Sequence, residues 1–279
     1  MAGTTSSLFT AAGLTKRYPG TVALDGLTVD VPRGRVGLVG ANGAGKTTLF
    51  RLLLGLTRPT EGTLTVCGHR LSDDPLAARS RLGYMPEHDC LPLDQTAADV
   101  VATLGELSGL PPRAARRRAS EVLDLVGLDE ARFRAVGGFS TGMRQRVKLA
   151  QALVADPVLA LLDEPTAGLD PTGREEMLAL VARLGSFGIS VLVATHLLDD
   201  VARVCDYVVM LDAGRLAAEL AARGVEATAG EGTVEVTVDG EAVLDAVRDA
   251  VADLGLPLHR MTSRVASLDE AYLASGRTV

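Results

Sequence analysis

A glycine-rich stretch near the N-terminus has the composition and spacing of a phosphate-binding loop. It fits the pattern G-x-x-x-x-G-K-[ST] between Gly40 and Thr47. Glycines let successive backbone N–H groups turn towards phosphate oxygens, and the Lys46 ammonium can reach the β- and γ-phosphates of a nucleoside triphosphate. The Thr47 hydroxyl can bind Mg²⁺. The residues predicted to contact the nucleotide are Gly40, Ala41, Asn42, Gly43, Ala44, Gly45, Lys46, Thr47 and Thr48.

This pattern alone does not distinguish between a kinase, a GTPase and an ATPase. A glycine-rich turn that carries a lysine by chance is disfavoured by the neighbouring segments. An apolar run at 36–39 predicts a strand directly before the loop, and apolar periodicity predicts a helix over 46–56 directly after it. A helix that begins here adds partial positive charge where the phosphates would lie.

Two adjacent carboxylates follow a second apolar run. Asp163 can contact Mg²⁺, directly or through water, and Glu164 can polarise a water that attacks the γ-phosphate. Pro165 comes next, so a strand that simply ends at a polar turn is the alternative interpretation. For this segment alone the two interpretations are equally good. The phosphate loop in the same chain favours the catalytic one.

The fold that must position these groups is predicted from the order of strands and helices. Apolar runs at 36–39, 158–162 and 190–195 predict buried strands, and helices are predicted at 141–155 and 173–184. Strands that alternate with helices indicate an α/β fold, with a parallel sheet covered on both faces. The helical periodicity between about 90 and 150 indicates an inserted helical subdomain.

The last part of the chain differs in composition from the residues before it. A segment rich in alanine and glycine spans 214–232, and apolar residues then alternate with polar ones from Val234 to Val238. This alternation predicts a strand, and a helix is predicted over 241–254. A second strand near 258–260 and a helix that begins at a capping box, 267–270, complete a small C-terminal α+β appendage of βαβα type.

Composition and charge exclude several classes of function. The chain has 35 acidic and 28 basic residues, a net charge of −7, so a general nucleic-acid binder is not expected. The basic run 113–118 is best interpreted as a solvated helix face. The three cysteines lie far apart, which suits neither a disulfide framework nor a zinc site and fits a reducing compartment.

The sequence can also be compared with the patterns of signal peptides and membrane-spanning helices. The first residues lack the basic and apolar segments of a signal peptide, and no apolar run reaches the roughly 18 residues that a spanning helix needs. We therefore expect a cytoplasmic protein. If it acts on a membrane, another polypeptide must supply the spanning part.

Three further segments stand in a fixed order around the two motifs. They are 139–143 (FSTGM), 167–170 (AGLD) and His196 at the end of the next apolar strand. With them, the chain from about Leu14 to Leu216 resembles the nucleotide-binding subunits of ATP-binding cassette (ABC) transporters. The resemblance implies a P-loop NTPase core with a mainly parallel sheet, an antiparallel β subdomain and a helical insert. The expected domains are an ABC ATPase domain over 1–220, with the helical subdomain at about 90–150, and an accessory domain over 221–279.

The resemblance also assigns roles to individual residues. Ser140 and Gly142 would close over the γ-phosphate bound by the opposite subunit, and Asp170 would lie between the subunits. His196 would contact the γ-phosphate, and Tyr18 would stack on adenine. Two neighbours of Ser140 depart from the family pattern, since Thr141 and Met143 replace the usual glycine and glutamine.

Glu87 is the clearest departure from the family pattern. The family more often has glutamine here, which senses Mg²⁺ and the attacking water and links to the membrane subunit. A carboxylate can bind Mg²⁺ at least as well, but it adds negative charge near the phosphates. We therefore expect Glu87 to contact the metal ion. The sequence does not determine how glutamate at this position affects the rate of ATP turnover or the coupling to the membrane subunit.

The resemblance implies an Mg²⁺-dependent ATPase that works as a pair, with ATP between the subunits. Its partners would be a second ABC subunit, identical or related, and an integral membrane permease that holds it at the inner face of the cell membrane. The segments 143–146 and 267–272 look most like export-type cassettes. The expected catalytic residues are Lys46, Glu164 and His196, and the expected metal ligands are Thr47, Glu87 and Asp163.

Two other classes remain as alternatives. A soluble ABC ATPase that remodels ribosomes or DNA would usually carry two cassettes or long coiled-coil insertions, and the sequence has neither. A P-loop kinase or GTPase leaves Ser140, Asp170 and His196 without a role, and a GTPase would strongly prefer guanine nucleotide.

Overall fold

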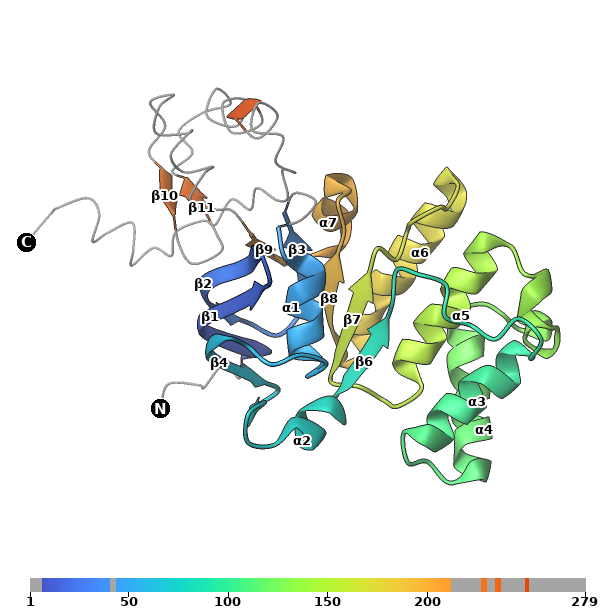
Figure 1. The fold of residues 1–279 in the computed structure, drawn as a ribbon. Helices are drawn as coiled ribbons and strands as arrows, with labels where there is room; N and C mark the ends of the chain where they lie inside the picture. The colour runs from blue at the N-terminus through green and yellow to red at the C-terminus, as the bar shows by residue number, and fades with distance from the viewer. Residues whose placement is uncertain (1–6, 41–43, 212–226, 230–233, 237–248, 251–279) are drawn as a thin grey trace, which may run out of the picture.

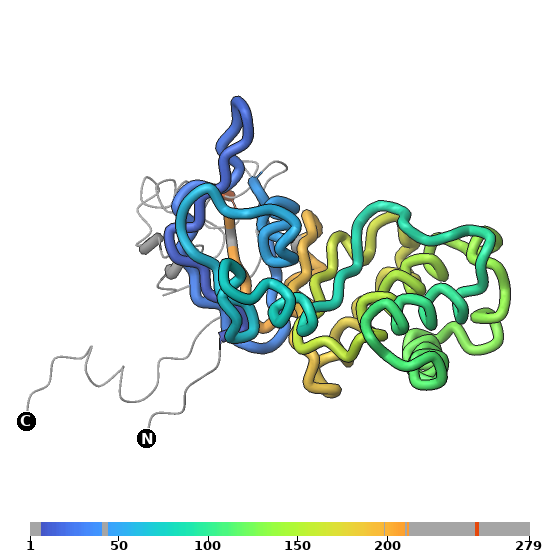
Figure 2. The backbone as a smooth tube through the Cα atoms, turned by 60° about the horizontal axis from the view of Figure 1, so that its bottom comes forward, coloured from blue at the N-terminus to red at the C-terminus, as the bar shows by residue number. Residues whose placement is uncertain are grey.

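The computed structural model describes residues 7–40, 44–211, 227–229, 234–236 and 249–250. Two lobes are visible in this part of the chain (Figures 1 and 2). One lobe contains two β-sheets with a helix between them, and the other is a group of helices that extends to one side. No helix in these residues is long and apolar enough to cross a membrane.

A five-stranded parallel sheet forms the centre of the molecule, in the order β6-β7-β8-β3-β9. Its middle strand β8 and the neighbouring β7 are buried along their whole length. Alternate residues face opposite ways, so that Leu162 and Val193 join one apolar core and Leu161 and Leu192 join another. Layers on both faces therefore cover this sheet, as the sequence predicts. The strands are β3 (Arg35–Val39), β6 (Leu82–Met85), β7 (Leu159–Asp163), β8 (Ser190–Ala194) and β9 (Tyr207–Met210).

An antiparallel sheet of four strands lies beside this centre, in the order β2-β1-β4-β5. Helix α1 (Lys46–Leu53) packs between the two sheets, and Leu49, Phe50 and Leu53 from this helix are fully buried in the shared core. The apolar side chains of α1 therefore fix the phosphate loop against both sheets. The strands are β1 (Phe9–Tyr18), β2 (Thr21–Val31), β4 (Glu61–Val66) and β5 (His69–Arg70).

Helices α6 and α7 cover the opposite face of the parallel sheet, and α3, α4 and α5 form the helical lobe, whereas α2 packs in the same core as α1. Helices α3 and α4 pair with each other, and α5 joins them to β6 and β7 (Figure 1). The helices are α2 (Pro75–Arg79), α3 (Ala97–Leu107), α4 (Pro112–Leu125), α5 (Thr141–Leu153), α6 (Pro171–Leu184) and α7 (Leu198–Val204), with short 3₁₀ turns at Glu130–Phe133, Val136–Gly138 and Gly185–Phe187.

The predicted fold class is confirmed in its three main parts: the parallel sheet, the antiparallel sheet and the helical insert. The accessory domain predicted for 221–279 lies mostly outside the described residues. Within it, β10 (Ala227–Ala229) pairs antiparallel with β11 (Val234–Val236). The second of these strands falls where the apolar alternation predicts one.

Candidate active site

The phosphate loop lies between β3 and α1, as the sequence predicts. Gly45 has a φ of 98°, and a Cβ there would lie 2.3 Å from the carbonyl oxygen of Ala23, so only glycine fits. The Lys46 Nζ donates a hydrogen bond to the Gly40 carbonyl at 2.6 Å. Ala44 and Thr48 are partly buried and Thr47 is exposed at the helix start, whereas Ala41, Asn42 and Gly43 lie outside the described residues.

The side chain of Asp163 stands at the end of β7 and is only 6% exposed. Burial, together with repulsion from the Glu87 and Glu164 carboxylates, raises its pKa to about 6. Lys46 acts in the opposite direction, because its ammonium attracts these carboxylates. Burial lowers the pKa of Lys46, while Glu164, Asp163 and Glu87 raise it. One ammonium and three carboxylates therefore meet at the carboxyl ends of the strands.

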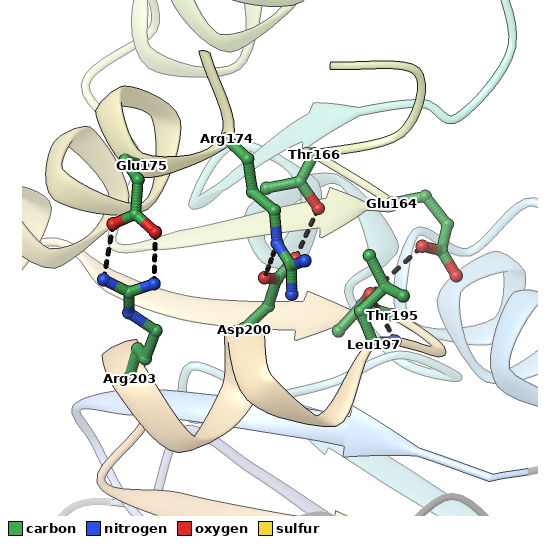
Figure 3. Close-up of polar contacts among 8 residues, drawn as sticks. All are labelled: Glu164, Thr166, Arg174, Glu175, Thr195, Leu197, Asp200 and Arg203. Carbon is green, nitrogen blue, oxygen red and sulfur yellow. Dashed lines mark hydrogen bonds and ion pairs between the residues drawn. The ribbon is translucent and has the colours of Figure 1, made fainter. Parts of the chain in front are cut away.

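Glu164 is held by the loop that follows β8. Parallel pairing sets Asp163 opposite Ala194, so the residues after each strand are neighbours. One Glu164 carboxylate oxygen accepts hydrogen bonds from the His196 backbone N at 3.0 Å and contacts its Nδ1 at 2.8 Å. The other accepts from the buried Thr195 hydroxyl at 3.1 Å (Figure 3). Glu164 has a φ of 49°, an unusual conformation for a side chain of this size.

The His196 ring remains accessible although its Nδ1 contacts Glu164. Its side chain is 56% exposed, compared with 11% for that of Glu164. The ring can therefore meet a ligand from solvent while Glu164 orients it. The structure brings Lys46, Glu87, Asp163, Glu164 and His196 into one group.

The residues of this group fit a site for Mg²⁺ that is completed by the nucleotide. Among the described residues, no cluster of three or more His, Cys, Asp or Glu side chains forms a cation site of its own. Mg²⁺ is usually bound by one or two carboxylates together with substrate phosphates and water. Asp163 and Glu87 repel each other strongly enough to affect the pKa of Asp163, and a divalent cation would relieve that repulsion.

The other predicted site residues lie at element ends elsewhere in the described chain. Ser140 caps α5 by accepting from the Met143 N–H at 3.2 Å, and Asp170 caps α6 by accepting from the Gly173 N–H at 2.9 Å. Gly142 lies in the first turn of α5, where the nearest atom to an added Cβ would be in Leu169. No hydrogen bond or ion pair found in the described chain joins these residues to the Lys46 group.

Tyr18 ends β1 on the antiparallel sheet. Its side chain is exposed, and the Lys16 Nζ lies 5.0 Å from the centre of its ring. A cation above one face of the ring leaves the other face for stacking.

Sequence reasoning missed a polar network behind the Glu164 segment. Asp200 on α7 is 1% exposed; it accepts a hydrogen bond from the Thr166 hydroxyl and one from the Arg174 Nε at 2.5 Å (Figure 3). Arg203 and Glu175 form a further ion pair between α7 and α6. These contacts fix the segment after β7 to the helix after β8. The only signal in the sequence is a pair of aspartates at the start of an apolar helix.

The chain matches a known protein family. The family model described as ABC transporter matches residues 5–167. Among curated proteins, the chain is 37% identical over 251 residues to a daunorubicin/doxorubicin resistance ATP-binding protein of Streptomyces peucetius, with 89% of this chain and 76% of that protein covered. It is 38% identical over 213 residues to a Nod factor export ATP-binding protein of Ralstonia nicotianae, with 76% and 66% covered.

A solved structure agrees with these matches. The fold is similar to that of a bacterial ABC transporter cassette solved as a dimer, with a TM-score of 0.66 and 26% identity. The match covers 73% of this chain and 94% of that one.

Proposed function

Because the chain belongs to the ABC transporter family as an ATP-binding subunit, we propose that it hydrolyses ATP to drive export through a separate membrane subunit. The observation that carries the proposal is the contact between Glu164 and His196 beside Lys46. A carboxylate that can take a proton from water, a ring that can reach a phosphate and an ammonium at the phosphate loop are the groups that hydrolysis of a γ-phosphate needs.

The roles follow from the chemistry of each group. Lys46 holds the β- and γ-phosphates, and the N–H groups at the start of α1 point to the same anion. Glu164 accepts a proton from the attacking water. His196, oriented by Glu164 through its Nδ1, contacts the γ-phosphate with its other ring nitrogen. Tyr18 stacks on the adenine ring.

Thr47, Glu87 and Asp163 are the residues proposed to hold Mg²⁺. When bound, Mg²⁺ neutralises charge that develops on the phosphate oxygens. Glu87 and Asp163 lie at the ends of the adjacent strands β6 and β7. Their separation is therefore set by the sheet, and the Glu87 carboxylate is close enough to raise the pKa of Asp163.

We further propose that two cassettes enclose each ATP. Ser140 stands at the exposed N-terminus of α5, with Gly142 in the first turn, and its hydroxyl caps this helix through the Met143 N–H. An exposed helix N-terminus with a serine cap can bind an anion, so the phosphate of an opposite subunit can lie there. Asp170 would lie between the subunits. The dimeric cassette structure supports this arrangement.

The partner is proposed to be an integral membrane permease, with the cassette at the inner face of the cell membrane. The two curated relatives carry names for drug resistance and Nod factor export. Those names support an exporter and do not fix the cargo of this chain. We keep the division into an ATPase domain over 1–220 and an accessory domain over 221–279 as a proposal.

Hydrolysis can be tested on the purified chain. The wild type should release phosphate from ATP only when Mg²⁺ is present. Lys46→Ala should lose ATP binding and hydrolysis together, because the phosphates lose their ammonium. Glu164→Gln should bind ATP and lose hydrolysis, because the amide accepts no proton. Turnover by Lys46→Ala at the wild-type rate would contradict the proposed site.

The membrane partner needs a separate experiment. A tagged Glu164→Gln chain would be recovered from gently solubilised native membranes with Mg-ATP present. A polytopic membrane protein in stoichiometric amount supports the transporter. Recovery of ribosomes or nucleic acid in its place would favour the soluble remodelling ATPases.

A further inference from the structure

Lys148 is a buried cation in the middle of helix α5. It is 2% exposed, and it is one of only three lysines in the sequence. Its Nζ donates hydrogen bonds to the backbone carbonyls of Pro86 at 2.8 Å and Glu87 at 2.7 Å. Both acceptors belong to the segment that leaves β6 with the Glu87 side chain. Helix α5 is thereby fixed to the backbone of a proposed metal ligand.

Packing alone does not explain a lysine at this position. A buried ammonium loses its hydration, and an apolar side chain of similar length would fill the same space without that cost. Here the cost is offset by the two carbonyls and by attraction to the carboxylates of Asp89, Glu87 and Asp163. Lys148 therefore attracts both Asp163 and Glu87, which is one of the two carboxylates that repel Asp163.

The rest of the α5–β6 contact is closely packed. A Cβ on Gly83 would lie 1.8 Å from the Ala152 carbonyl oxygen, so the backbones of helix and strand nearly touch. One turn before Ala152, Lys148 makes its two strong contacts. Gln151 lies between Lys148 and Ala152 in the helix. Its side chain donates a hydrogen bond to the Tyr84 carbonyl at 3.4 Å, which is longer than either bond from Lys148. Gln151 also accepts a hydrogen bond from the Cys90 Sγ at 3.7 Å, further along the segment after β6. Among the described residues of α5, Lys148 is the one whose side chain donates to the Pro86 and Glu87 carbonyls.

We propose that Lys148 is a positioning residue, which ties the backbone of Pro86 and Glu87 to helix α5 and so holds the Glu87 carboxylate beside Asp163 in the Mg²⁺-ATP site. This inference rests on the proposed function. It predicts that Lys148 acts on metal affinity through the side chain of Glu87. A residue needed only for folding would instead alter stability and leave the metal dependence unchanged.

The first test compares Lys148→Met with Gln151→Met as a matched control. Each substitution removes a side-chain hydrogen-bond donor by which α5 contacts β6 or the residues that follow it. Of the two side chains, only that of Lys148 donates to the Glu87 carbonyl. Binding of a fluorescent, non-hydrolysable ATP analogue would be titrated against Mg²⁺ and repeated in EDTA. Lys148→Met should raise the half-saturating Mg²⁺ concentration about tenfold or more, a size usual for groups that orient metal ligands. Gln151→Met should shift it less than about twofold, and binding in EDTA should be unchanged in both.

The second test asks whether the effect passes through Glu87. In a chain that already carries Glu87→Ala, adding Lys148→Met should change the half-saturating Mg²⁺ concentration by less than about twofold. The inference would be overturned if Lys148→Met shifted the half-saturating Mg²⁺ concentration equally with and without the Glu87 side chain. It would also be overturned if Lys148→Met alone caused no shift. If Lys148→Met does not fold, judged by circular dichroism, Lys148→Gln takes its place with the same criteria.

Failure of the proposed function would look different. A wild-type chain whose analogue binding does not respond to Mg²⁺ would contradict the Mg²⁺-ATP site itself, and the inference with it. A normal wild-type response combined with an unchanged Lys148→Met midpoint would contradict only the role of Lys148.

Discussion

Replacing Asp163 with asparagine should stabilise the nucleotide-free protein at neutral pH. The folded protein raises the pKa of this carboxyl from its ordinary 3.8 to about 6, chiefly by burial. The folded state therefore holds the proton more tightly than the unfolded chain does. Stability is greatest when Asp163 is protonated in both states, and it falls as the pH rises from about 4 to about 6. Above that range the folded protein carries the full cost of a buried, repelled carboxylate.

The size of the effect follows from the two pKa values. At about 1.4 kcal/mol for each pH unit between them, ionisation of Asp163 costs about 3 kcal/mol of folding free energy at pH 8. At pH 5 the cost is about half as large, and at pH 3 it is close to zero. Asparagine has a similar shape and no charge, so Asp163→Asn should recover this stability with the same pH dependence.

The assay is urea unfolding followed by far-ultraviolet circular dichroism, since the chain contains no tryptophan. Wild type, Asp163→Asn and the exposed control Asp94→Asn would be compared in EDTA at pH 3, 5 and 8. The reasoning would be refuted if Asp163→Asn raised the free energy of unfolding by the same amount at all three pH values. A lower free energy of unfolding at pH 8 would refute it as well. Mg-ATP should then stabilise the wild type more than Asp163→Asn, because the variant lacks a proposed metal ligand and binds the nucleotide through Lys46 and the phosphate loop alone.

Two further changes test the packing and the metal site. Gly83→Ala should destabilise the protein by about 2 kcal/mol or more, because the new Cβ would meet the Ala152 carbonyl oxygen at 1.8 Å; an unchanged urea midpoint would show that α5 and β6 are less closely packed. Glu87→Gln should leave ATP binding nearly intact in an equilibrium binding assay, because Lys46 and the phosphate loop remain; a complete loss of binding would give Glu87 a larger role.

The sequence predicts the parts of the site that follow directly from local pattern. The loop before Lys46 and the carboxylates after β7 stand at strand ends, and the apolar runs that predict those strands are short and unambiguous. Strand β1 is less visible, because its pairing shifts register between Ala11 and Leu14 and again after Leu14. These irregularities break the alternation of apolar and polar residues on which strand prediction depends.

Contacts between distant segments could not be predicted from local pattern. The bond from Thr195 to Glu164 depends on the register of β7 and β8, which one sequence does not state. From the sequence alone, Lys148 fits the surface of an amphipathic helix. Its burial follows from its hydrogen bonds to the segment after β6, which only the structure shows. The family resemblance supplied His196 and Ser140, whose own surroundings in the sequence would fit a structural role equally well.

The central claim, that ATP joins two cassettes at a composite site, is tested most directly by the mass of Glu164→Gln in solution. Light scattering would be measured with EDTA alone, with ATP and EDTA, and with Mg-ATP. The account predicts a monomer in the first two and a dimer with Mg-ATP, and Lys46→Ala in the same chain should abolish the dimer. A monomer with saturating Mg-ATP bound would contradict the composite site.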